Sequence, residues 1–168
     1  MQHVILDAHN IMHKDAEMKR LMDTSLVDAR QVLVRIVEFL AQKRPDVLYT
    51  LVFDGTNAGV LSPCTNVIIR ETKRFQEADE VIKELVRYEE KPHVVTVVSS
   101  DTEVHNFAKL SGCKVQSSEA FLREVRASMS GVKRTPEEKR LAVYDKPTHV
   151  SRAEVEMMRK LFGGTSQR

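Results

Sequence analysis

The chain has 168 residues, of which 42% are hydrophobic and 30% are charged. This length fits one domain, and the composition is that of an ordinary folded protein rather than a disordered one. The formal net charge of +2 is too small to indicate a partner. No apolar run approaches the roughly 18 residues of a membrane span, and no signal peptide is evident. The two cysteines, Cys64 and Cys113, are far apart, so we expect reduced thiols in a cytoplasmic protein.

Short apolar runs alternate with amphipathic segments. Runs bounded by turn residues and rich in β-branched side chains predict strands. These runs are residues 4–6, 47–53, 67–69, 94–98 and 114–116. Apolar residues at helical spacing predict the helices, which are residues 26–43, 76–90, 102–110 and 118–129. The polar stretch 11–23 is expected to be loop with some helical turn. Strands that alternate with helices predict an α/β fold, a three-layer parallel sheet with helices on both faces.

The charge divides unevenly along the chain. Residues 131–168 hold nine Lys or Arg and five Asp or Glu, a net charge of +4, so residues 1–130 carry a net charge of −2. A basic segment is compatible with a polyanionic partner, although many solvated tails have the same composition. We therefore expect a folded domain over residues 1–130 and a basic C-terminal extension over residues 131–168, with a terminal helix from about Ser151.

Aspartates follow three of the predicted strands, and a fourth begins a helix after another strand. They are Asp7, Asp54, Asp79 and Asp101. Ligands of open α/β sheets bind outside the carboxyl ends of the strands, where these side chains would meet. A lone aspartate there is more often a turn-former or a helix cap, and Asp101 could be a cap alone. Four together favour a cation site, because crowded carboxylates repel one another unless a cation neutralises them.

Carboxylate oxygens suit Mg²⁺ or Mn²⁺. The natural chemistry with one or two such ions is attack of a metal-bound water on a phosphodiester bond. Zinc is disfavoured because the histidines are scattered; His9 and His13 are four apart but lie in or beside the stretch expected to be loop. The sequence contains no glycine-rich phosphate loop and no serine nucleophile elbow, so nucleotide-dependent and serine-hydrolase chemistry is unsupported.

Four short motifs resemble, in order, those of the NYN branch of PIN-like nucleases. They are Leu6-Asp7-Ala8-His9-Asn10, Val52-Phe53-Asp54-Gly55, Glu77-Ala78-Asp79-Glu80-Val81-Ile82 and Ser99-Ser100-Asp101. The likeness runs from about residue 3 to 129 and is closest to the YacP-like group, which includes a bacterial ribosome-associated mRNA endonuclease. Two departures occur. The pair Ala8-His9 stands where the family usually has Gly-Tyr, and Glu77 stands where Thr is frequent.

The resemblance implies a PIN-like fold with an acidic pocket that holds Mg²⁺ or Mn²⁺. It also implies cleavage of single-stranded RNA, such as mRNA, in association with the ribosome. Asp7, Asp79 and Asp101 would be metal ligands or water-positioning acids, and Asp54 would complete the acidic edge. Asn10 would orient a carboxylate or a phosphate.

Basic side chains near the predicted pocket and in the C-terminal extension are candidates to hold the RNA backbone; a solvated-surface role is the alternative for each. They are Arg70, Lys73, Arg74, Lys133, Arg134, Lys139 and Arg140. Glu103 would be either an outer acid of the pocket or a helix-surface residue.

Two other functions compete with the metal-dependent endoribonuclease. One is an RNA- or ribosome-binding module with weak or lost nuclease activity, which would tolerate loss of the acids. The other is a small-molecule phosphohydrolase, which ranks last because the paired acids that such enzymes need around the first strand are missing.

Overall fold

The structure, a computed structural model, describes residues 1–55, 59–73 and 76–130. The predicted terminal helix and five of the candidate RNA-binding residues lie outside these ranges. Those residues are Arg74, Lys133, Arg134, Lys139 and Arg140. Within the described ranges, no helix combines the length and the apolar character that crossing a membrane requires.

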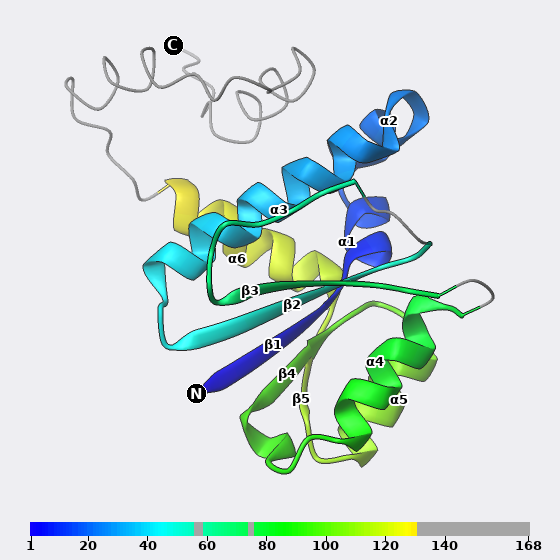
Figure 1. The fold of residues 1–168 in the computed structure, drawn as a ribbon, viewed down its shortest axis with the longest axis vertical. Helices are drawn as coiled ribbons and strands as arrows, with labels where there is room; N and C mark the ends of the chain where they lie inside the picture. The colour runs from blue at the N-terminus through cyan, green and yellow to red at the C-terminus, as the bar shows by residue number, and fades with distance from the viewer. Residues whose placement is uncertain (56–58, 74–75, 131–168) are drawn as a thin grey trace.

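A parallel sheet of five strands runs through the middle of the described domain (Figure 1). Its order is β3-β2-β1-β4-β5, so the first strand of the chain is the central one. The bounds of the strands are Gln2–Asp7 for β1, Val47–Phe53 for β2, Val67–Glu71 for β3, Val95–Val98 for β4 and Lys114–Gln116 for β5. The predicted strands are confirmed, because continuous branched apolar runs bury side chains on both faces of a parallel sheet.

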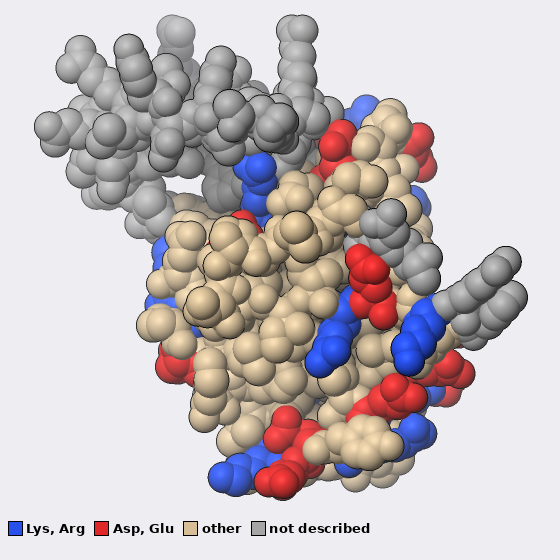
Figure 2. Space-filling view, viewed as in Figure 1, with Lys and Arg blue, Asp and Glu red and all other residues tan. Residues whose placement is uncertain are grey.

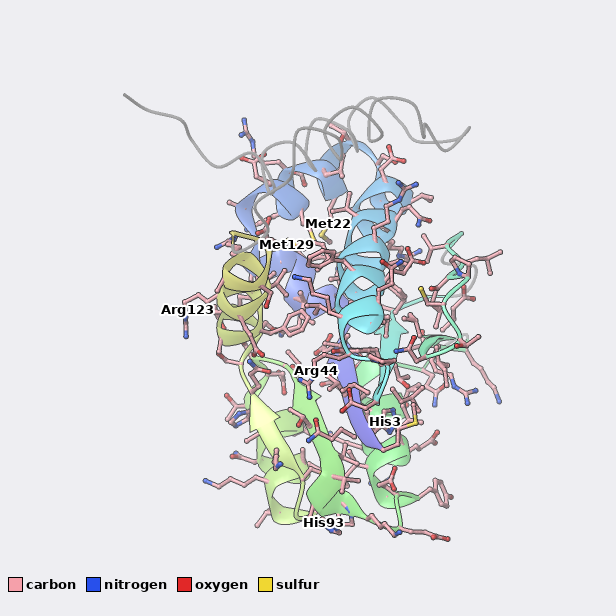
Figure 3. All side chains as sticks on the ribbon, turned by 90° about the vertical axis from the view of Figure 1, so that its left-hand side faces the viewer. His3, Met22, Arg44, His93, Arg123 and Met129 are labelled. Atoms are coloured by element: carbon pink, nitrogen blue, oxygen red, sulfur yellow. The ribbon has the colours of Figure 1, made fainter. Side chains whose placement is uncertain are left out.

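Helices cover both faces of the sheet, as predicted. One face carries α1 (Ala8–Lys14), α2 (Ala16–Thr24), α3 (Leu26–Lys43) and α6 (Ser118–Ser130), and the other carries α4 (Ala78–Arg87) and α5 (Thr102–Leu110). The buried side chains form two clusters, one on each face of the sheet. The central strand β1 contributes to both, since Leu6 belongs to the first cluster and Ile5 to the second. Figure 3 labels Met129, which belongs to the first cluster, and Met22, which packs against it. It also labels His93, which lies on the short 3-10 turn Pro92–Val94 before β4.

The prediction of a loop over residues 11–23 was wrong, because the chain forms α1 and α2 there. Each of these helices begins at an aspartate whose side chain accepts hydrogen bonds from the free backbone N–H groups of the first turn, Asp7 for α1 and Asp15 for α2. Met18 and Leu21 are buried against the first core cluster. These caps and apolar contacts outweigh the polar composition that suggested a loop.

The strand order reverses once within the sheet. From β1 the chain moves outward through β2 and β3, and then returns through α4 to β4 on the other side of β1. The order therefore reverses between β1 and β4, and open α/β sheets bind ligands outside the carboxyl ends of strands at such a point. Leu6 pairs with Val98 across these two strands, so Asp7 and Ser99 lie side by side at their carboxyl ends.

Removal of the α2 cap should destabilise the fold. The Asp15 side chain is 1% exposed and accepts from Glu17 N (3.0 Å) and Met18 N (2.9 Å). We expect Asp15→Ala to lower the free energy of unfolding by about 1–2 kcal/mol, measured by urea denaturation. Asp23→Ala removes an exposed acid from the same helix and should change it by less than about 0.5 kcal/mol. Equal effects of the two substitutions would contradict the assignment of Asp15 as a cap.

Candidate active site

Asp7 lies at the centre of the carboxyl edge of the sheet. It is the last residue of β1, 4% exposed, and it caps α1 by accepting a hydrogen bond from the backbone N–H of Asn10 (3.1 Å) through Oδ1. The hydroxyl of Ser99 donates to Oδ2 at 2.8 Å. Burial raises the pKa of Asp7, and these hydrogen bonds offset part of that rise by stabilising the ionised form.

Asp54 follows β2, the neighbour of β1, and joins two elements to the site. The backbone N–H of Ala78 donates to its Oδ1 at 2.7 Å, so Asp54 satisfies the N-terminus of α4 from a different strand. The local residue Glu77 is exposed and makes no capping bond with its side chain. Gly55 comes next with a φ of +86°, a conformation that other L-residues rarely adopt, and its N–H donates to Thr72.

Two histidines lie next to Asp54 in a chain of side-chain contacts. Nδ1 of His9 lies 3.3 Å from Oδ2 of Asp54, and Nε2 of His9 lies 3.0 Å from Nε2 of His13. Both histidines are on α1, one helical turn apart, which corrects the expectation that they lie in a loop. Ala8, between Asp7 and His9, is fully buried, so this position requires a small residue.

Asp79 lies in the first turn of α4, and the charges of the other three aspartates act on its pKa. Burial, followed by the negative charges of Asp7 and Asp101, raises the pKa of Asp79 to about 6. Lys83 partly offsets this rise, and Asp54 contributes the smallest part of it. The aspartates that were predicted from four separate motifs therefore share one electrostatic environment.

Asp101 caps α5 and is tied to Asp7 through one side chain. Its Oδ1 accepts from Glu103 N (2.8 Å) and Val104 N (3.1 Å), as the capping alternative predicted. Its own backbone N–H donates to Ser99 Oγ at 3.0 Å, the same atom that donates to Asp7. Asp101 is thus both a cap and a neighbour of Asp79, and the two interpretations do not exclude each other.

Asn10 acts on the backbone of the site. Its Oδ1 accepts from the backbone N–H of Ser100 (2.9 Å) and from the hydroxyl of Ser118 (2.8 Å). These bonds hold the turn after β4 against the start of α6, which fixes where Ser99 and Asp101 lie.

Sequence reasoning did not select the polar side chains that support these acids. Ser99 is fully buried, yet a serine after a strand carries no signal that distinguishes it from an ordinary turn residue. Glu119 accepts a hydrogen bond from the Ser100 hydroxyl and pairs with Lys14 at 3.0 Å. These contacts, that from Ser100 foremost, lower the pKa of Glu119 to about 2.

Basic residues flank the acidic edge. Arg70 lies near the end of the edge strand β3 and Lys73 follows that strand; both side chains are exposed. Because β3 pairs with β2, both residues lie on the same side of the sheet as Asp54, which follows β2. Figure 2 shows basic and acidic side chains next to one another over the ends of β2 and β3, whereas the middle of this face is mostly uncharged. Lys83 is paired with Glu103, so Glu103 lies on the helix surface near the pocket in an ion pair.

The donor set fits a hard divalent cation by its chemistry. Burial and then the neighbouring carboxylates raise the pKa of Asp79, whereas a cation would lower it, and Mg²⁺ prefers such oxygen ligands. Within the described residues, no three His, Cys, Asp or Glu side chains form a group that could hold one ion together. An ion at this edge would therefore take one or two carboxylates directly, with water as its other ligands, as Mg²⁺ commonly does.

Comparison with protein families identifies the fold and the motifs. The model of the YacP-like NYN domain matches residues 4–162. The chain belongs to the YacP-like NYN domain family. This family is nuclease-like, and its nucleases generally depend on divalent metal ions. Membership therefore supports a nuclease-type function related to RNA for this chain. The family predicted from the four motifs is confirmed.

Solved structures agree on the fold. A crystal structure of Rae1 (YacP) from Bacillus subtilis, in a mutant form with one tryptophan replaced by leucine, is 22% identical and has a TM-score of 0.65, covering 96% of this chain and 92% of that one. Another crystal structure of Rae1 (YacP) from Bacillus subtilis is 20% identical with a TM-score of 0.64, covering 97% of this chain and 91% of that one. No curated protein matches the sequence.

The repulsion at Asp79 predicts a pH-dependent effect of its removal. The folded pKa of about 6 exceeds the ordinary 3.8, so the fold binds the proton more tightly than the unfolded chain, and the resulting stability is lost as the pH rises through 6. We compare the free energy of unfolding of Asp79→Asn with that of the wild type in a buffer free of divalent ions. The difference, variant minus wild type, should therefore be more positive at pH 8 than at pH 4. Urea denaturation at the two pH values measures this difference.

Glu80→Gln is the matched control, because Glu80 is the exposed next residue of α4. It should alter stability by the same small amount at both pH values. A pH-independent effect of Asp79→Asn would contradict the electrostatic coupling of the four aspartates.

Proposed function

We propose that this protein is a metal-dependent endoribonuclease that hydrolyses phosphodiester bonds of single-stranded RNA, with mRNA on the ribosome as its substrate. The observation that carries the proposal is the convergence of Asp7, Asp54, Asp79 and Asp101 at the switch point of the sheet, in a chain of a nuclease-like family.

Asp7, Asp79 and Asp101 would hold Mg²⁺ or Mn²⁺ directly or through water, with Asp54 at the border of the set. When bound, the ion supplies Lewis-acid chemistry: it lowers the pKa of a water and stabilises negative charge on the phosphate. Asp7 is buried and is held by hydrogen bonds from the Ser99 hydroxyl and the backbone N–H of Asn10. Asp79, in the first turn of α4, would hold the ion or position the attacking water.

The catalytic proposal predicts loss of cleavage without loss of binding. A translated mRNA on purified ribosomes is incubated with the full chain and Mg²⁺ or Mn²⁺, and cut ends are mapped by primer extension. We expect cutting by the wild type, its abolition by EDTA, and a decrease on the order of 100-fold or more for Asp7→Asn and for Asp79→Asn.

Asp23→Asn serves as the control, because it removes an exposed acid of α2 and should cut like the wild type. If the wild type binds ribosomes or RNA without cutting, and both site variants bind equally well, the acids are structural. The protein is then an RNA- or ribosome-binding module, which is the competing function.

The basic side chains at the end of β3 should hold the RNA backbone. Replacement of both Arg70 and Lys73 by Gln should weaken binding of single-stranded RNA and flatten its salt dependence. The slope of log K against log salt concentration should fall by about 0.7 for each phosphate that the variant no longer binds. Titrations by fluorescence anisotropy at several salt concentrations measure this slope. Because both side chains are exposed, stability should not change, and an unchanged slope would place the RNA elsewhere.

A further inference from the structure

A pocket opens beside the acidic edge, on the side of α1 and α3. Its lining residues are His9, Met12, Leu26, Arg30, Phe53 and Asp54, and its volume is about 110 Å³. The side chains of His9 and Asp54 are each 41% exposed, so the pocket is reached from solvent. For comparison, a closed apolar cavity of about 150 Å³ takes up benzene. The pocket is smaller than that cavity but open to solvent, so it could take the edge of a planar ring rather than enclose a whole one.

A buried hydrogen-bond donor without a partner belongs to this pocket. Arg30 is 9% exposed, its Nη2 donates to the backbone carbonyl of Asp54 at 2.6 Å, and its guanidinium lies 5.6 Å from the centre of the Phe53 ring. In the described part of the chain, Nε of Arg30 is the one buried side-chain nitrogen or oxygen atom that has no hydrogen-bond partner. Such an atom is costly unless an acceptor, either a water or a ligand, satisfies it.

Asp54, which Arg30 contacts in the pocket lining, provides an acceptor. A carboxylate has about four lone-pair sites, and the contacts of the Asp54 carboxylate with Ala78 and His9 use two of them. The pocket thus places a cationic N–H donor and an anionic acceptor around an apolar slot. A phosphate would meet repulsion from Asp54, whereas a neutral ring with a carbonyl oxygen next to a ring N–H would satisfy both groups.

We propose that this pocket binds an unstacked nucleobase of the RNA, uracil or guanine, next to the cleavage site. Both bases carry a ring carbonyl oxygen for Arg30 and an adjacent ring N–H for Asp54, and the edge that bears these two groups would enter the pocket beside Met12, Leu26 and Phe53. Adenine has neither a carbonyl oxygen nor a protonated ring nitrogen, and it is disfavoured. The pocket then sets a base preference for the nuclease, a deduction that rests on the proposed function.

Short homopolymers test the pocket without cleavage. The full chain carrying Asp79→Asn is titrated with ten-nucleotide oligo(U) and oligo(A), and affinities are measured by fluorescence anisotropy. We expect oligo(U) to bind about tenfold more tightly, since a buried donor and acceptor pair discriminates against a base that leaves them unpaired. Leu26→Trp, which fills the slot from a residue that is 39% exposed, should reduce the difference to less than twofold.

Two further variants separate the pocket from unrelated effects. Leu110→Trp adds the same bulk on the exposed surface of α5, where Leu110 is 89% exposed, and should keep the tenfold preference. Arg30→Lys keeps the positive charge but removes the Nε donor, so it should lose the preference. If this buried substitution fails to fold, the comparison of Leu26→Trp with Leu110→Trp still decides the matter.

Equal affinity for the two oligomers, a preference that survives in Leu26→Trp, or no binding of either oligomer would overturn the pocket. The proposed nuclease fails by a different result, the absence of metal-dependent cutting on ribosomes. Cleavage by the wild type at sites without a base preference, unchanged in Leu26→Trp, would leave the nuclease standing and remove the pocket alone. Cut sites biased toward uracil or guanine at one position, with the bias abolished in Leu26→Trp, would support it.

Discussion

The hydrogen bond from the Ser99 hydroxyl to the buried Asp7 carboxylate is the contact on which the rest of the site depends. It joins the ends of β1 and β4, the two strands between which the sheet order reverses. The same hydroxyl accepts from the backbone N–H of Asp101, so one oxygen atom positions two of the four acids. Because Asp7 is nearly inaccessible to water, this bond replaces hydration that burial has removed.

Three acids of the site also hold elements of the fold in place. Asp7 caps α1 and Asp101 caps α5. Asp54 accepts a hydrogen bond from the first N–H of α4, although Asp54 follows β2 and is distant from α4 in the sequence. The helix N-termini therefore point toward the site, where their partial positive charge favours carboxylates. This dual use explains how a folded chain can tolerate a concentration of negative charge at one edge of its sheet. The remaining repulsion appears at Asp79, which lies inside the first turn of α4 and whose pKa rises to about 6.

Negative charge at the centre and basic residues at the margin suit a polyanionic substrate held around a cation. Arg70 and Lys73 lie beyond the acids, at and after the end of the edge strand, and Arg30 and Asp54 line a pocket beside them. Backbone contacts at the margin would provide affinity without sequence preference. A buried donor and acceptor would add a preference for certain bases, so the two roles are carried by different parts of one surface.

The sequence by itself determined the layered fold and the four aspartates, because buried parallel strands are continuous branched apolar runs and the acids stand where such runs stop. It also indicated the family, through four motifs in order. It did not indicate α1 and α2, whose stability comes from caps and from Met18 and Leu21 packed on the core. Only the tertiary structure decided that Ser99 links Asp7 to Asp101, that Asp54 caps α4, and that Arg30 is buried beside Phe53. Most of these contacts join residues that are far apart in the chain, and the residues follow no periodic pattern in the sequence. The contacts depend on distance and burial in space, which a sequence pattern does not contain.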